Sequence, residues 1–229
     1  MTDGLAGQTK KFVFRSKSKN NGDLNGEYLE INIPELLQAS YSFYTWPSAP
    51  VLAWFLWHHR HEICGKRILE IGSGTALPGI LAAKCGAIVT LSDSSTLPKS
   101  LAHITSCCQA NGLTPGLNIQ VVGVTWGLFL SNIFKIGPFD LIISSDCFYD
   151  PAIFEDILAT VSYFLERGNT RFLCTYQERS SDWSIEALLK KWNLRCHLID
   201  LNSVSANSGI NFTELMGDHS IHLLEIFHN

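Results

Sequence analysis

One stretch of the chain, Lys66 to Ile80, restricts the fold more than any other. Its sequence, KRILEIGSGTALPGI, joins a run of apolar residues to two closely spaced glycines and a following helical segment. The apolar run is typical of a buried strand, and Gly72 and Gly74 permit the left-handed backbone angles of a tight turn. Thr75 is the predicted N-cap of the helix, and Pro78 is compatible with a first helical turn. The stretch therefore predicts a strand, a glycine turn and a helix.

The glycine turn offers free amide N–H groups to a ligand at the positive end of the helix dipole. The dinucleotide fingerprint G-x-G-x-x-G is not met, because Leu77 stands at its third glycine position, and no P-loop Gly-Lys-Ser/Thr follows. An acidic residue, Glu70, followed by G-x-G is instead the pattern of S-adenosylmethionine (SAM) sites in seven-stranded methyltransferases. A generic strand-to-helix turn of any α/β domain also explains this stretch taken alone.

A second acidic residue at a strand end favours a nucleotide site. Residues 87–93 form a predicted buried strand that ends in Asp93, which follows Gly72 by 21 residues. In nucleotide-binding βαβ units, a carboxylate about 20 residues beyond the glycine turn binds the ribose. The alternative is an ordinary aspartate in a turn after a strand. Strand, position and spacing together favour the ribose contact.

The rest of the chain alternates strands and helices, which predicts an α/β fold with a doubly wound, seven-stranded, mainly parallel sheet. Residues 27–229 form one predicted domain, and residues 1–26 are predicted to be a polar, flexible tail. Residues 12–14 and 28–33 alternate like a small hairpin. The predicted strands of the main sheet are 66–71, 87–93, 119–124, 139–146, 171–176, 194–201 and 221–227. The predicted helices begin near Pro47, Thr75, Leu97, Ile153 and Ser184.

Several candidate ligand-binding residues follow directly on predicted strands. Ligands of doubly wound sheets bind beyond the carboxyl ends of the strands. Gly72, Asp93, Trp126 and Asp146 all lie at such ends, so we expect them at one rim of the sheet. Trp46 precedes a predicted helix, where its ring could form a wall of a cofactor site.

Composition excludes several classes of protein. The net charge of −4 gives no global attraction to nucleic acid. The seven cysteines are scattered and lack C-x-x-C spacing, which favours reduced core thiols over a disulfide framework or a metal site. We expect no signal peptide, and no apolar run reaches membrane-spanning length. We therefore expect a soluble monomer of the cytoplasm or nucleus, without a metal, a membrane or direct nucleic-acid contact.

From about Tyr41 to the C-terminus, the sequence resembles the seven-stranded protein methyltransferases that include the methyltransferase-like proteins and calmodulin-lysine methyltransferase. The D-x-x-Y motif after the fourth strand is the most specific mark of this family. The matching residues are Trp46-Pro47, the stretch from Glu70 to Thr75, Leu97-Pro98, Trp126-Gly127 and Asp146-Cys147-Phe148-Tyr149. The resemblance implies a Rossmann-like class I methyltransferase fold and SAM as the cofactor.

The resemblance also implies roles for individual residues. The residues that would bind SAM are Trp46, Glu70, Gly72, Gly74, Asp93, Trp126 and Ser145. Asp146 and Tyr149 would face the point of methyl transfer as catalytic residues, and Asp146 would also line the methionine end of SAM. This chain departs from the family pattern at Ala76, where glycine is frequent, and by the extra residues Ser94-Ser95-Thr96.

The residues themselves do not decide which side chain accepts the methyl group. Most members of the family methylate lysine in proteins, whereas the branch that this chain resembles implies arginine in histone H3. A guanidinium group favours a carboxylate fork, for which the candidates are Asp146, Asp150, Glu155 and Glu178. No Asn/Asp-Pro-Pro-Tyr run follows the fourth strand, which speaks against a nucleic-acid amine. The alternatives are a small-molecule methyltransferase and a module of the same fold that acts by binding chaperones or chromatin proteins.

Overall fold

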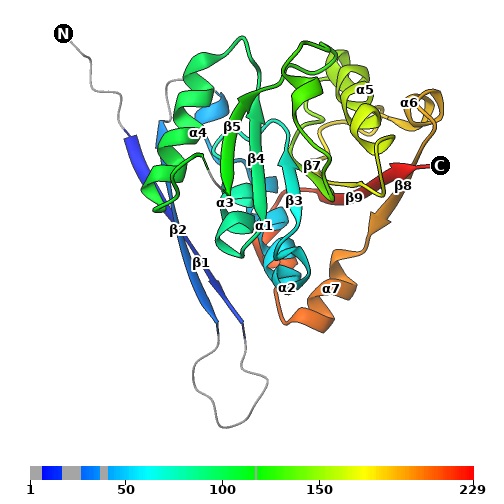
Figure 1. Ribbon diagram of the computed structural model, residues 1–229. Helices are drawn as coiled ribbons and strands as arrows, with labels where there is room; N and C mark the ends of the chain where they lie inside the picture. The colour runs from blue at the N-terminus through cyan, green and yellow to red at the C-terminus, as the bar shows by residue number, and fades with distance from the viewer. Residues whose placement is uncertain (1–6, 17–26, 37–40, 117) are drawn as a thin grey trace.

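A seven-stranded sheet in the order β5-β4-β3-β6-β7-β9-β8 forms the centre of the molecule (Figure 1). This computed structural model describes residues 7–16, 27–36, 41–116 and 118–229. All neighbouring strands are parallel except β9, which runs antiparallel to both β7 and β8. The prediction of a doubly wound, mainly parallel seven-stranded sheet is confirmed. The strands are β3 (Arg67–Glu70), β4 (Ile88–Asp93), β5 (Ile119–Gly123), β6 (Leu141–Ser145), β7 (Arg171–Gln177), β8 (Leu194–Ile199) and β9 (Ile221–His228).

Helices cover both faces of this sheet and bury its apolar side chains. One core contains buried residues of α1 (Ser48–His58), α3 (Leu77–Lys84) and α4 (Pro98–Ala110). The other contains those of α5 (Phe154–Leu165), with α6 (Glu186–Lys191) packed beside it. Successive strand residues face opposite cores: Ile68 belongs to the first and Leu69 to the second. Short elements complete the fold: η1 (Tyr41–Phe43), α2 (Arg60–Ile63), η2 (Ile133–Lys135), η3 (Pro151–Ile153), α7 (Leu201–Ser208) and α8 (Phe212–Met216).

The N-terminal residues form a two-stranded antiparallel sheet, as the alternating pattern predicted. It consists of β1 (Gly7–Arg15) and β2 (Tyr28–Leu36) and lies beside α4 (Figure 1). The side chain of Asn111, at the end of α4, accepts a hydrogen bond from the amide of Asn32 (2.8 Å) and donates one to its carbonyl (2.7 Å). The expectation of a flexible tail over residues 1–26 is therefore wrong for β1, because Phe14 is buried in the core. Residues 1–6 and 17–26 lie outside the described part.

Two local predictions are corrected. Thr75 is not the N-cap of α3: the cap residue is Ala76, in the left-handed conformation with φ 59°, so the helix begins one residue later. Pro78 lies in the first turn as predicted. The predicted strand 194–201 ends at Ile199, because the side chain of Asp200 accepts a hydrogen bond from the amide of Asn202 and caps α7. None of the helices in the described residues is long and apolar enough to cross a membrane.

Candidate active site

The glycine turn after β3 is enclosed by two other segments. Gly72 and Gly74 have φ values of 61° and 52°, which favour glycine. A Cβ atom at Gly72 would lie 2.7 Å from the ring of Trp126, so the bare backbone leaves room for the indole. A Cβ atom at Gly74 would lie 3.4 Å from the carbonyl of Ser42. The structure thus brings Gly72, Gly74 and Trp126 together at one place on the rim, as predicted.

Asp93 lies at the carboxyl end of β4, next to the turn. Its Oδ2 accepts a hydrogen bond from the amide of Gly74 (3.0 Å), and its Oδ1 accepts one from the amide of Ser94 (2.7 Å). Burial raises the pKa of this carboxyl, while the two amide donors lower it. Each carboxylate oxygen retains a lone pair that can accept a hydroxyl hydrogen. This arrangement fits the ribose contact predicted from the spacing to Gly72.

The loop Ser94-Ser95-Thr96, which the resemblance marked as extra, lies between Asp93 and Thr125. The amide of Ser95 donates a hydrogen bond to the hydroxyl of Thr125 (3.0 Å), and the two hydroxyls are 2.7 Å apart. Thr125 immediately precedes Trp126, so the loop helps to fix the position of the indole. The serine-rich loop therefore stabilises the segment that contains Trp126.

An aromatic segment covers the other side of the turn. The ring of Trp46 stacks on Tyr41 with centroids 6.0 Å apart, and its indole N–H donates to the carbonyl of Tyr41 (3.1 Å). The hydroxyls of Thr45 and Thr75 lie 3.0 Å apart and join this segment to the glycine turn. Buried Glu35 accepts a hydrogen bond from the amide of Thr45 (3.0 Å), so β2 positions the segment that contains Trp46.

Glu70 lies in the interior of the protein and not at the open rim. It is fully buried, and its Oε2 accepts a hydrogen bond from the amide of Gly79 in α3 (3.2 Å). Within the described residues its Oε1 has no hydrogen-bond partner. Burial raises the pKa of this carboxyl to about 8, against an ordinary value of 4.5. The Glu70 side chain therefore links β3 to α3 in the interior of the protein.

Stability should accordingly fall as pH rises from about 5 to 8. In this interval the folded state binds more protons than the unfolded state, because the pKa of Glu70 is about 8 when folded and 4.5 when exposed. Each unit of raised pKa corresponds to about 1.4 kcal/mol, so the free energy of unfolding should decrease by a few kcal/mol. Glu70→Gln should abolish most of this decrease in urea unfolding curves. The control is Glu62→Gln, an exposed carboxylate, whose curves should keep the wild-type pH dependence.

Asp146 follows β6 and is bound by an arginine that the sequence did not single out. The guanidinium of Arg179 donates to Oδ1 (2.9 Å) and to Oδ2 (2.6 Å), and the amide of Gln177 also donates to Oδ1 (3.2 Å). The Asp146 side chain is only 4% exposed. Asp146 also has a left-handed backbone, with φ 61°. Because three donors already bind this carboxylate, it cannot form the predicted fork with a second guanidinium, but Oδ2 can accept one further hydrogen bond.

Tyr149 and Ser145 lie on either side of Asp146 in the chain. Tyr149 is half exposed, and burial together with the charge of Asp93 raises the pKa of its hydroxyl. Ser145 is partly buried at the end of β6, paired in register with Thr175. The predicted catalytic and cofactor residues therefore share the carboxyl rim of β3, β4, β5 and β6, apart from buried Glu70 and from Trp46, which precedes α1.

The other predicted guanidinium partners have different surroundings. Asp150 caps η3 by accepting a hydrogen bond from the amide of Ala152, and Glu155 forms an ion pair with Lys191. Glu178 lies 3.0 Å from the ring of His222. No group of His, Cys, Asp and Glu side chains suited to a metal ion occurs among the residues that the structure describes.

Comparison with known proteins identifies the family to which this chain belongs. Residues 25–188 match the family described as lysine methyltransferase. The chain belongs to this family. It is 46% identical to the histone-arginine methyltransferase METTL23 of Mus musculus over 97% of this chain and 87% of that protein. It is 50% identical to the Homo sapiens protein of the same name over 80% of this chain and 96% of that protein. The predicted resemblance, including its branch, is confirmed.

The fold of this methyltransferase also recurs in solved structures. The Thermus thermophilus 16S rRNA N2 G1207 methyltransferase, solved in complex with AdoMet and guanosine, superposes with a TM-score of 0.62. It has 14% sequence identity and covers 96% of this chain and 51% of that one. The class I methyltransferase fold is thus confirmed, and the chain is a SAM-dependent methyltransferase. The left-handed glycine turn beside the Asp93 carboxylate fits this cofactor.

Proposed function

We propose that this methyltransferase methylates arginine in histone H3. The observation that carries the proposal is the 46% identity, over 97% of this chain, to a protein named histone-arginine methyltransferase. The aligned range covers nearly the whole chain, so it extends across the rim and the segment after β7 as well as the cofactor half. A protein-lysine acceptor is the second candidate, because the family that the chain matches is described as lysine methyltransferase.

The residues of the rim suit transfer to the nitrogen of a basic side chain, which loses a proton as it attacks the methyl group. SAM supplies a methyl group that its sulfonium centre already activates. The chain must therefore hold the acceptor nitrogen in line and exclude water, and such positioning can contribute roughly 7–11 kcal/mol in favourable cases. Asp146 retains a lone pair on Oδ2 that can orient an N–H group of the acceptor, and exposed Tyr149 offers its ring face to a cation.

Mass spectrometry of the methylated product tests this proposal. Recombinant histone H3 is incubated with the wild-type protein and isotopically labelled SAM, digested, and examined for methyl-arginine and methyl-lysine. We expect methyl-arginine. A product that carries only methyl-lysine would replace arginine by the second candidate. Label found only in small metabolites, when cell extract is used as the acceptor source, would remove the protein substrate altogether.

The proposed substrate also implies where the protein works. Histone H3 is assembled into chromatin in the nucleus and is held by chaperones before that, so we propose a nuclear and cytoplasmic protein that meets chromatin or chaperone-bound histone. Fractionation of cells that express the tagged chain tests this placement. Exclusive recovery with membranes or secreted material would contradict it.

A further inference from the structure

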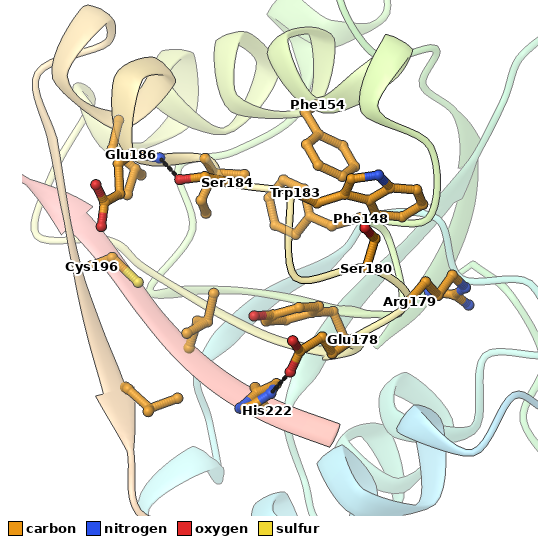
Figure 2. Close-up of a pocket in the computed structure, with 15 residues that line it drawn as sticks. Phe148, Phe154, Glu178, Arg179, Ser180, Trp183, Ser184, Glu186, Cys196 and His222 are labelled. Carbon is orange, nitrogen blue, oxygen red and sulfur yellow. Dashed lines mark hydrogen bonds and ion pairs between the residues drawn. The ribbon is translucent and has the colours of Figure 1, made fainter. Parts of the chain in front are cut away.

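A cavity of about 450 Å³ lies between the sheet and the segment that leads from β7 into α6 (Figure 2). Its lining includes Tyr176 of β7, His222 of β9 and Leu198 of β8 on the sheet side. Trp183 and Ser184 line it from the connecting segment. None of the nine residues predicted to hold SAM or to act in catalysis lines it, so the cavity is separate from the glycine turn.

The cavity nevertheless adjoins the rim where methyl transfer is expected. Arg179 lines the cavity and also binds the carboxylate of Asp146. Phe148, which lies within the D-x-x-Y motif, forms part of its wall. In Figure 2 the guanidinium of Arg179 points to one side, away from the aromatic rings at the centre. An acceptor chain bound at the rim would therefore have this cavity beside it.

The charges around the cavity favour a cation. Two carboxylates, those of Glu178 and Glu186, belong to its lining. The guanidinium of Arg179, also in the lining, is bound to Asp146, so its charge is compensated outside the cavity. His222 contacts Oε2 of Glu178 at 3.0 Å, and in the described part of the chain no hydrogen bond reaches the other oxygen. Glu178 is 41% exposed, so an incoming group can reach it.

Aromatic rings supply the other walls. The ring of Tyr176 stacks on His222 with centroids 5.2 Å apart, and Phe154 contacts both Phe148 and Trp183 edge-on. Trp183 is 37% exposed. Aromatic faces attract ammonium and guanidinium groups, and the apolar stems of lysine and arginine pack well on such surfaces. Carboxylates combined with exposed rings are thus complementary to a long basic side chain.

We propose that this cavity binds a second basic side chain of the substrate protein, a lysine or arginine that flanks the methylated residue. The inference rests on the proposed protein substrate, because only a polypeptide carries a flanking side chain next to the acceptor. Glu178 contacts the cationic head, Trp183 and Tyr176 pack on the stem, and Glu186 adds a second negative charge to the lining. The cavity thereby selects basic segments, whereas the rim residues carry out the transfer.

Two measurements test the cavity. In the first, N-acetyl-arginine amide and its neutral analogue N-acetyl-citrulline amide are titrated into the full chain, and the indole N–H resonance of Trp183 is followed by NMR. In the second, the KM for histone H3 is measured for Glu178→Gln. The matched control is Glu166→Gln, which removes another carboxylate paired with a histidine, His228, outside the cavity.

We expect the arginine derivative, and not the citrulline derivative, to shift the Trp183 resonance. Glu178→Gln should weaken this response and raise the KM for histone H3 by about tenfold, as expected for a lost hydrogen bond to a charged group. The kcat and SAM affinity of Glu178→Gln should stay at wild-type values. Glu166→Gln should change neither the Trp183 response nor the KM for histone H3. No shift, an equal shift with citrulline, or an unchanged KM would overturn the inference. If the wild-type protein does not methylate histone H3, the proposed substrate fails, and the NMR titration alone decides whether the cavity binds cations.

Discussion

Gly72→Arg should abolish SAM binding while the protein remains folded. The new side chain must begin at a Cβ position 2.7 Å from the ring of Trp126, on a backbone with φ 61°. A left-handed backbone costs a residue other than glycine roughly 1–2 kcal/mol. The arginine would also occupy the space between the turn and the indole. We expect the dissociation constant for SAM, measured by calorimetry, to rise by at least about 100-fold, equivalent to roughly 2.7 kcal/mol.

Gly112→Arg provides a matched control for this experiment. Gly112 also has a left-handed backbone, with φ 71°, but a Cβ atom there would meet nothing within 4 Å. The two variants share the substitution and the backbone strain and differ in their surroundings. Gly112→Arg should bind SAM with wild-type affinity, and its melting temperature should be close to that of Gly72→Arg. If both variants bind SAM equally well, the glycine turn does not belong to the cofactor site.

The second large effect is expected at the Asp146–Arg179 pair. Asp146→Asn keeps the shape of the side chain, and asparagine tolerates the left-handed backbone that Asp146 adopts. It removes the charge that holds the guanidinium of Arg179. Because misplacement of a positioning group by about 1 Å can lower rates about 10²-fold, we expect a loss of this order in kcat at saturating SAM. Tyr149→Phe, which keeps the ring, should reduce kcat less than Asp146→Asn.

Arg179→Lys tests whether methyl transfer depends on the two parallel hydrogen bonds between Arg179 and Asp146. Lysine keeps the positive charge but cannot form two parallel hydrogen bonds with one carboxylate. We expect lower kcat with nearly unchanged SAM affinity, which a general loss of folding would not produce. Arg171→Lys is the control, because Arg171 pairs with Glu225 at an exposed position. Full activity of both Asp146→Asn and Arg179→Lys at saturating SAM would show that the pair has no part in methyl transfer.

The sequence by itself determined the alternation of strands and helices and the gathering of the predicted cofactor residues at one rim of the sheet. These features are encoded locally: an apolar run of strand length, glycines where the backbone is left-handed, and an acidic residue at a fixed spacing. Local pattern was therefore enough to locate Gly72, Gly74, Asp93 and Trp126, because parallel strands end at the same rim. The local signal failed at Thr75, since the hydroxyl of Thr75 contacts Thr45 instead of capping α3.

Only the tertiary structure decided the partners of these residues. Arg179 is 33 residues from Asp146, and no periodicity relates the two; the pairing of β6 with β7 brings them together. The burial of Glu70 beneath Gly79 likewise depends on how α3 packs on β3. The cavity arises because β9 lies between β7 and β8, which places His222 beside Glu178. Such contacts depend on side chains that are distant in sequence, so local pattern carries no information about them.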